Sequence, residues 1–212
     1  MKQYLTEFIG TFFLVLVIAL TGNPLAIGSM LMVMVYMGGP VSGAHYNPAV
    51  TIAVWLRGKI KMADALVYMV VQLTAAVAAA IFFYLIYGET KHFVPAPAEG
   101  INMLKPFAVE AVFTFALASV VLAVATSKKS SGNSYFGIAI GFTVMAAAYA
   151  GGGISGGAYN PAVGVGPLIA DAVLQHGTGL KHAWLYIAGP CTGGIAAGLV
   201  YRLTNPEELR ES

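Results

Sequence analysis

The sequence predicts an all-α membrane protein with six transmembrane helices and two half-helices, and three observations lead to this prediction. Of the 212 residues, 58% are hydrophobic and only 9% are charged, whereas a soluble domain carries about a quarter charged residues. Long apolar stretches recur six times along the chain. Two closely similar segments, each followed by a short apolar run, lie 113 residues apart. We expect a single transmembrane domain over residues 1–212.

The composition also excludes several classes of protein. The 11 basic and 9 acidic residues give a net charge of +2, so the sequence carries no polycationic signal for nucleic-acid binding. The single cysteine, Cys191, and four scattered histidines offer neither a disulfide framework nor a metal-ligand cluster. The sequence holds no nucleotide-binding motif. We therefore expect no cofactor, no metal ion and no enzymatic activity.

The six spans are predicted from apolar length. A helix needs about 20 apolar residues to cross the hydrocarbon, and the candidate stretches are Thr6–Thr21, Leu25–Tyr36, Asp64–Tyr87, Pro106–Thr126, Ser134–Ala150 and His182–Leu203. The second is expected to end early, because Gly38-Gly39-Pro40 interrupts it. A signal peptide is the alternative for the first stretch, which follows Lys2. We favour a retained helix, because Glu7 lies inside it and the internal repeat requires it.

The chain is an internal duplication. Residues 41–50 and 154–163 share seven identities, and Glu7 and Glu110 are each followed four residues later by Thr-Phe. These matches indicate two repeats, over roughly 1–100 and 101–212. Each repeat holds three spans, which is an odd number. The second copy must therefore enter the membrane from the opposite face, and the result is an inverted repeat.

Each long match contains an Asn-Pro-Ala box. The boxes are Asn47-Pro48-Ala49 and Asn160-Pro161-Ala162. Proline favours the first turn of a helix, and the apolar runs that follow, 49–56 and 162–170, are too short to cross a bilayer. We expect two half-helices that enter from opposite faces and meet by their N-termini near the midplane.

The meeting point of the half-helices is predicted to be wet and electropositive. Non-helical backbone, expected over 42–46 and 151–159, is tolerated at that depth only where it is buried or lines a water-filled cavity. Each helix N-terminus carries about half a positive charge. Asn47 and Asn160 can donate to a passing oxygen and cannot ionise, which suits water or hydroxyl groups and opposes cations and protons. The alternative is that both residues only cap their half-helices.

Basic residues are distributed unequally between the two faces. On the six-span count, eight fall on one face and three on the other. The eight are Lys2, Arg57, Lys59, Lys61, Lys128, Lys129, Arg202 and Arg210, and the three are Lys91, Lys105 and Lys181. An excess of Lys and Arg marks the cytoplasmic side, so we expect both termini in the cytoplasm. The compact loops and minimal tails favour a multi-pass protein of a bacterial inner membrane.

The two boxes, the two Glu-x-x-x-Thr-Phe openings and Gln72 together resemble the aquaporin (major intrinsic protein) family over essentially the whole chain. The resemblance implies six spans and two half-helices, a homotetramer with one pore per subunit in the lipid bilayer, and passive conduction of water or small neutral solutes. It implies that Glu7, Glu110 and Gln72 brace the half-helix loops; a proton-carrying role for the carboxylates is the alternative. His45 resembles the family's loop histidine, for which packing is favoured over pH gating.

The chain departs from the family after the second box, where Val163 replaces the usual Arg. By their distance from the boxes, Ile27, Ala148 and Gly157 take the other three positions of the family's constriction. The quartet contains no aromatic, histidine or charged residue, so we expect a wide, apolar constriction. Such a channel would admit glycerol, urea or ammonia alongside water, unless Tyr149 or Tyr159 swings inward and narrows it.

Other functions remain open at this point. The alternatives are a strict water channel, a secondary transporter, which also uses inverted repeats, and an ion-conducting pore. A transporter needs ion-binding or proton-relaying groups at mid-depth, and the sequence offers only Glu7 and Glu110. The missing Arg is what favours an ion pore. A structural junction protein would need large extracellular loops, and only 88–100 has any length.

Overall fold

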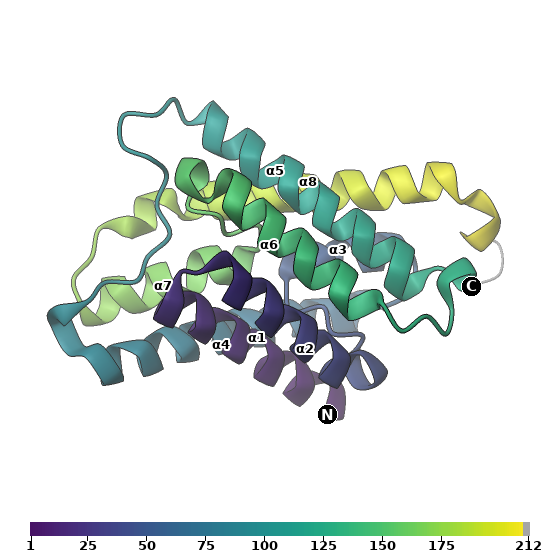
Figure 1. Ribbon diagram of the computed structural model, residues 1–212, viewed down its shortest axis with the longest axis horizontal. Coiled ribbons are helices and arrows are strands. Elements are labelled where there is room, and N and C mark those ends of the chain that lie inside the picture. The colour runs from purple at the N-terminus through teal and green to yellow at the C-terminus, as the bar shows by residue number, and fades with distance from the viewer. Residues whose placement is uncertain (210–212) are drawn as a thin grey trace.

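The computed structural model describes residues 1–209, and within them it has eight α-helices and no β-strand. The helices run along the long axis of the molecule (Figure 1). Six of them are long and apolar enough to cross a membrane, which confirms the predicted number of spans. They are α1 (Lys2–Thr21), α2 (Pro24–Ser42), α4 (Met62–Tyr87), α5 (Leu104–Val121), α6 (Phe136–Ser155) and α8 (Ala183–Thr204).

The two remaining helices are the expected half-helices. They are α3 (Pro48–Leu56), with 9 residues, and α7 (Pro161–Leu174), with 14. At the rise of an α-helix they span roughly 14 and 21 Å, short of the ~30 Å of hydrocarbon. Figure 1 shows α3 and α7 in opposite halves of the helix bundle.

Two helices extend further than the sequence predicted. α2 does not end at Gly38-Gly39-Pro40 but continues to Ser42, with Pro40 inside its last turns. α6 continues through Gly151–Gly153 to Ser155, so the non-helical stretch before α7 is shorter than the expected 151–159. Helical bonding satisfies backbone groups at membrane depth without external partners, and this outweighs the weak helix propensity of Gly and Pro here.

Helix packing corresponds between the two halves of the chain. α1 packs against α2 and α4, and α5 packs in the same way against α6 and α8. The half-helix α7 lies against α4 from the other half, as α3 lies against α8. α2 and α6, which are equivalent by sequence, contact each other. The half-helices are thus held by spanning helices of both halves.

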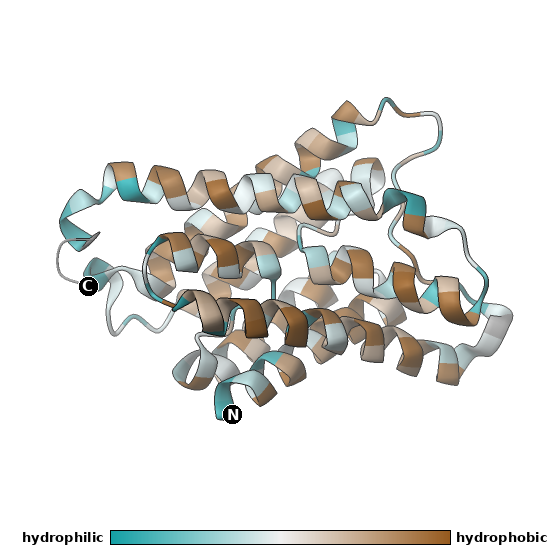
Figure 2. Ribbon diagram, turned by 180° about the vertical axis from the view of Figure 1, so that it is seen from behind, coloured by the Kyte–Doolittle hydropathy of each residue, from teal (hydrophilic) through white to brown (hydrophobic). Residues whose placement is uncertain are grey.

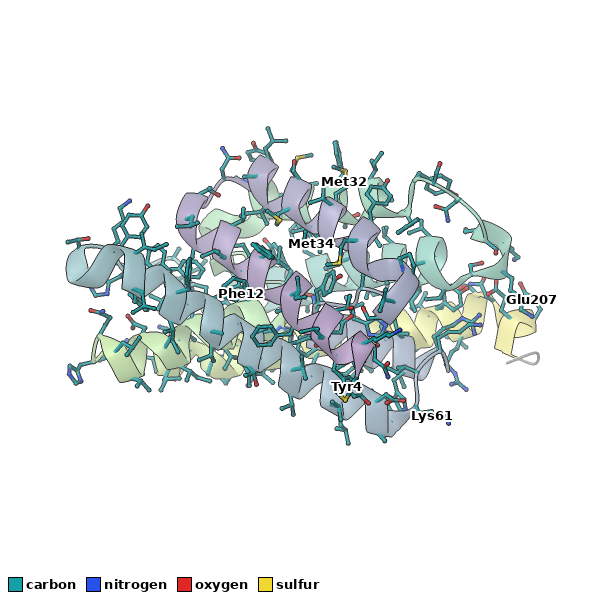
Figure 3. The ribbon with its side chains drawn as sticks, turned by 90° about the horizontal axis from the view of Figure 1, so that it is seen from below. Tyr4, Phe12, Met32, Met34, Lys61 and Glu207 are labelled. Atoms are coloured by element: carbon teal, nitrogen blue, oxygen red, sulfur yellow. The ribbon has the colours of Figure 1, made fainter. Side chains whose placement is uncertain are left out.

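Both chain termini lie at the same end of the bundle. Tyr4 Oη donates to Asp64 Oδ1 over 2.7 Å, and Arg57 pairs with Glu208, so both termini contact the segment around the start of α4. Figure 3 shows Tyr4, Lys61 and Glu207 toward this end. We call it the terminal end and the opposite one the distal end. Hydrophilic residues gather at the two ends, and hydrophobic residues cover the helices between them (Figure 2).

The C-terminal turn, Pro206–Leu209, is anchored by one buried carboxylate. Glu208 is 4% exposed and accepts hydrogen bonds from Ser127 Oγ at 2.6 Å, Arg57 Nη2 at 2.7 Å and Tyr201 Oη at 2.9 Å. These donors favour the ionised carboxylate, with the Ser127 hydroxyl contributing most, and they lower the pKa of Glu208 from 4.5 to about 2. The anchoring is therefore fully present above about pH 4.5 and is lost as the pH falls toward 2.

We expect Glu208→Gln to lower the free energy of unfolding by about 1–3 kcal/mol at pH 7, because the buried Arg57 loses its counter-charge. Thermal unfolding of the detergent-solubilised protein measures this, and the difference from wild type should shrink as the pH approaches 2. Glu207→Gln is the matched control, since Glu207 is 55% exposed and pairs with the exposed Lys129. Equal losses in both variants would contradict the anchoring role.

Candidate functional site

The two half-helices meet at their N-termini and are hydrogen-bonded to each other's loops. Asn47 Nδ2 donates to the carbonyl oxygen of Tyr159 over 2.9 Å, and Asn160 Nδ2 donates to that of Tyr46 over 2.9 Å. Each asparagine Oδ1 also accepts from the backbone N–H groups two and three residues further on. Both residues therefore cap their helices. One hydrogen of each amide group remains for a further partner.

The boxes begin the half-helices and concentrate positive potential at the junction. Pro48 and Pro161 are the first helical residues of α3 and α7, and Ala49 and Ala162 are completely buried behind them. Two N-termini that converge at one place add their partial positive charges. The positive potential at the junction therefore comes from the backbone dipoles, because none of the side chains in the boxes ionises.

The loop before α3 is braced by Glu7, which is fully buried. Its carboxylate accepts from Ser42 Oγ at 2.7 Å, from the backbone N–H of His45 at 2.9 Å and from that of Tyr46 at 2.7 Å. Gln72 Nε2 donates to the same carboxylate over 2.9 Å. These bonds hold Tyr46 in the left-handed region, with φ at 50°, which a bulky residue adopts only when its surroundings fix it.

Glu110 makes the equivalent contacts before α7. It is also fully buried, and it accepts from Ser155 Oγ at 2.7 Å, from Ala158 N at 3.0 Å and from Tyr159 N at 2.6 Å. Tyr159 has φ at 49°, matching Tyr46. With these bonds both carboxylates are engaged by the loops that precede the half-helices.

His45 occupies a different position from the bracing carboxylates. Its Nδ1 lies 3.1 Å from Thr51 Oγ1, and the same hydroxyl accepts from Gln72 Nε2 over 3.1 Å. The His45 ring packs edge-on against Tyr68. His45 also lines two adjoining cavities, one at the half-helix junction and one at the terminal end. His45 therefore packs against the first loop and also borders these two cavities.

One tyrosine fastens each loop to the helix that precedes it, and this feature was not predicted from the sequence. Tyr46 Oη donates to the carbonyl oxygen of Met34 and Tyr159 Oη to that of Ala147, both over 2.9 Å. The Tyr46 ring lies against Gly38, and the Tyr159 ring lies against Gly151. The two tyrosines, the two carbonyl acceptors and the two glycines are each 113 positions apart. The internal repeat was therefore a signal that could have revealed these contacts.

The two tyrosines considered as inward gates differ in position, and only Tyr159 lines the lumen. Tyr149 is 64% exposed on α6. Tyr159 is 1% exposed, and its hydroxyl is engaged by the backbone of α6. Its contribution at the half-helix junction is the carbonyl oxygen that receives the Asn47 amide.

We expect adjacent glycine substitutions on α6 to have opposite effects on stability. A Cβ at Gly151 would lie 2.5 Å from Tyr159 Oη and 2.6 Å from Val109 Cγ1, whereas one at Gly152 would meet nothing within 4 Å. Gly151→Ala should therefore lower the thermal unfolding midpoint by several degrees. Gly152→Ala should leave it unchanged or raise it, because alanine favours a helix over glycine by about 1 kcal/mol. Equal destabilisation by both would contradict the close Tyr159 contact.

A narrow lumen passes the half-helix junction. Its volume is about 30 Å³, room for about two or three water molecules. Asn47 and Asn160 line it, and most of the remaining wall is aliphatic. Vestibules of about 390 Å³ at the terminal end and about 630 Å³ at the distal end adjoin it. The path is therefore polar at the half-helix junction, and the space between the two vestibules is much smaller than either vestibule.

The structure brings the four expected constriction residues together. Ile27, Ala148, Gly157 and Val163 all line both the lumen and the distal vestibule, so they lie where the two meet. All four residues are apolar, and the lumen that they adjoin has a volume of about 30 Å³. Ile18, which the sequence analysis did not include, lines the same place and occupies part of the space.

Other lumen-lining residues were also missed from the sequence. They are apolar, come from both repeats and include Leu14, Leu31, Leu117, Val121, Ile140 and Val144. Leu14 and Leu117 follow Glu7 and Glu110 by seven residues each, that is, by two helical turns. The repeat spacing combined with helical periodicity could have found them. Within residues 1–209, no group of three or more His, Cys, Asp or Glu side chains is placed to hold a metal ion.

Six membrane-spanning helices around a lumen, with two half-helices abutting at its centre, define a multi-pass membrane channel. The chain belongs to the major intrinsic protein family, whose profile matches residues 1–201. It is accordingly a passive transmembrane channel for water and small solutes. The family is one of transporters rather than enzymes.

Named relatives and a solved structure agree with this assignment. Aquaporin NIP1-4 of Oryza sativa subsp. japonica is 34% identical over 96% of this chain and 77% of its own length. Glycerol uptake facilitator protein-like 6 of Lactiplantibacillus plantarum is 33% identical over 98% of this chain and 100% of its own. The crystal structure of the aquaglyceroporin from Plasmodium falciparum superposes with a TM-score of 0.86, at 20% identity, over 100% of this chain and 99% of that one. The last match shows the shared fold.

Proposed function

We propose that this channel passes small neutral solutes, such as glycerol, urea or ammonia, alongside water. The observation that supports the proposal is Val163, which lies 3% exposed where the lumen meets the distal vestibule. An Arg at that place would present a fixed charge and several hydrogen-bond donors, which Val163 lacks. The 33% identical relative named as a glycerol uptake facilitator is consistent with this substrate class.

In this proposal the half-helix junction opposes cations and protons. Asn47 and Asn160 line the lumen at the convergence of two helix N-termini, and neither side chain ionises. A cation that reaches this point loses hydration and meets two positive dipole ends. Lys59, which lines the terminal vestibule, adds a positive charge on the approach from that end.

Stopped-flow light scattering on proteoliposomes tests the proposed substrates. Water, glycerol, urea and ammonia are compared with protein-free vesicles, and a pH-sensitive dye reports proton leak. We expect fast water flux, measurable flux of the neutral solutes and no proton leak. Fast water flux without glycerol or urea flux would show a strict water channel. A saturable, gradient-coupled flux would show a secondary transporter, and ion conductance in planar bilayers would show an ion pore.

We further propose a homotetramer in a bacterial inner membrane, with the terminal end in the cytoplasm. The basic residues Arg57, Lys129 and Arg202 support this orientation, since each bonds to a group near the terminal end. Arg210, which was counted with them, lies outside the described residues. Native mass spectrometry in detergent should give four copies. A C-terminal reporter that is active only in the cytoplasm should be active; inactivity would reverse the orientation.

A further inference from the structure

Equivalent residues of the two repeats line the lumen. At the distal end, Ile18, Ile27 and Val163 line both the lumen and the vestibule; we call these three the distal collar. Ile18 lies 11 residues after Glu7, and Val121 lies 11 after Glu110. Ile27 and Val163 are each 113 positions from their counterparts, Ile140 and Val50.

The three counterparts also line the lumen, and one of them reaches the terminal vestibule. Val50, Val121 and Ile140 all line the lumen, and Val121 also lines the terminal vestibule. These three residues, the terminal collar, are 2%, 5% and 4% exposed. Asn47 and Asn160 line the lumen as well. Because the repeat is inverted, we infer that the terminal collar lies across the polar centre from the distal collar, so that a solute passes one collar, then the polar centre, then the other collar.

We propose that the terminal collar is a second specificity-determining constriction, in series with the distal collar; this inference rests on the proposed passage of neutral solutes. Aliphatic side chains cannot replace the hydrogen bonds that a solute leaves behind in the vestibule, so each collar imposes a desolvation cost. In a channel with Val163 in place of an Arg, both collars are aliphatic, and His45 adds one polar group at the terminal end. Selection is then made twice, and each collar favours neutral molecules that give up fewer hydrogen bonds over larger and more strongly hydrated ones.

The series arrangement has a measurable consequence. Resistances in series add, so widening one of two similar constrictions can at most double the permeability. Widening both constrictions lowers both resistances, and this should raise permeability by more than about fivefold. The effects of the two substitutions are then more than multiplicative. A single limiting constriction gives a different result, because one substitution alone yields the full increase.

Ile140→Ala, Ile27→Ala and the double variant, reconstituted in proteoliposomes, test this inference by glycerol, urea and water permeability. We expect each single variant to raise glycerol permeability by less than about twofold, and the double variant by more than about fivefold. Ile138→Ala is the matched control, because Ile138 is 48% exposed on the same helix. If Ile140→Ala is poorly folded, Val121→Ala replaces it, since it removes less volume.

Two results would overturn the inference. One is that the terminal-collar variants change no permeability either alone or together with Ile27→Ala. The other is that Ile27→Ala alone gives the whole increase of the double variant. Failure of the proposed function is distinguishable, because wild-type protein would then pass water but neither glycerol nor urea. In that event the comparison of single and double variants is made on water permeability.

Discussion

Replacing Val163 with Arg should lower glycerol and urea permeability by at least about tenfold, which corresponds to about 1.4 kcal/mol of added barrier. Val163 is 3% exposed and lies where the lumen opens to the distal vestibule. The longer side chain would occupy a passage that is already small, and its guanidinium would hold water in place. Water permeability should fall much less, because a single file of water needs less width. Stopped-flow measurements on reconstituted Val163→Arg provide the comparison.

Val173→Arg is the matched control for this substitution. Val173 lies on the same half-helix, α7, and is 71% exposed, so the added charge stays outside the lumen. We expect wild-type permeability for all solutes in this variant. If Val163→Arg leaves solute flux unchanged while the protein remains folded, the distal end is not where solutes are selected.

Glu7→Ala should abolish the accumulation of folded protein. The substitution removes the acceptor of four hydrogen bonds, from Ser42, His45, Tyr46 and Gln72. Each buried donor left unsatisfied costs about 1–3 kcal/mol, and the sum is comparable with the total stability of a typical protein, about 5–15 kcal/mol. Release of Tyr46 also frees the carbonyl that receives the Asn160 amide. The yield of monodisperse protein in detergent and its thermal unfolding midpoint measure the effect.

Two further variants make the test specific. Glu99→Ala removes an exposed carboxylate from the loop between the repeats and should leave yield and flux unchanged. Glu7→Gln keeps one oxygen acceptor, and we expect an intermediate yield. Wild-type stability in Glu7→Ala would mean that the loop is held without the carboxylate and that its bracing role is wrong.

The extent of the spans shows what a local pattern can and cannot predict. Apolar length predicted six crossing helices, and the proline after each Asn predicted where α3 and α7 begin. The ends of α2 and α6 were predicted too early, because Gly and Pro usually stop helices. At Gly38 and Gly151 the glycines instead make room for tyrosine rings. Each ring belongs to a tyrosine eight residues further on, in the loop after the helix, and the usual helix-stop patterns take no account of that contact.

The candidate site also contains some residues that the sequence predicted and others that it did not. The quartet Ile27, Ala148, Gly157 and Val163 was placed by counting from the boxes, and all four residues line one end of the lumen. Ile18 and Val121, which line its two ends, lie on α1 and at the end of α5. Nothing in their local sequence separates them from residues that face lipid, because an apolar residue suits both places equally. Their position depends on which face of each helix the half-helices cover.

The sequence by itself determined that the protein is a duplicated, membrane-embedded helical channel, because composition, apolar length and paired boxes are properties of the chain alone. Only the tertiary structure decided how the parts of the chain are joined. The Asn47 amide donates to the loop before Asn160, and the Asn160 amide donates to the loop before Asn47. Tyr46 and Tyr159 each fasten a loop to the preceding helix, and Glu208 ties the C-terminal turn to Arg57. These contacts join groups that are 12 to 151 residues apart. Hydrogen bonds act over about 3 Å, so they form only after the helices are placed side by side.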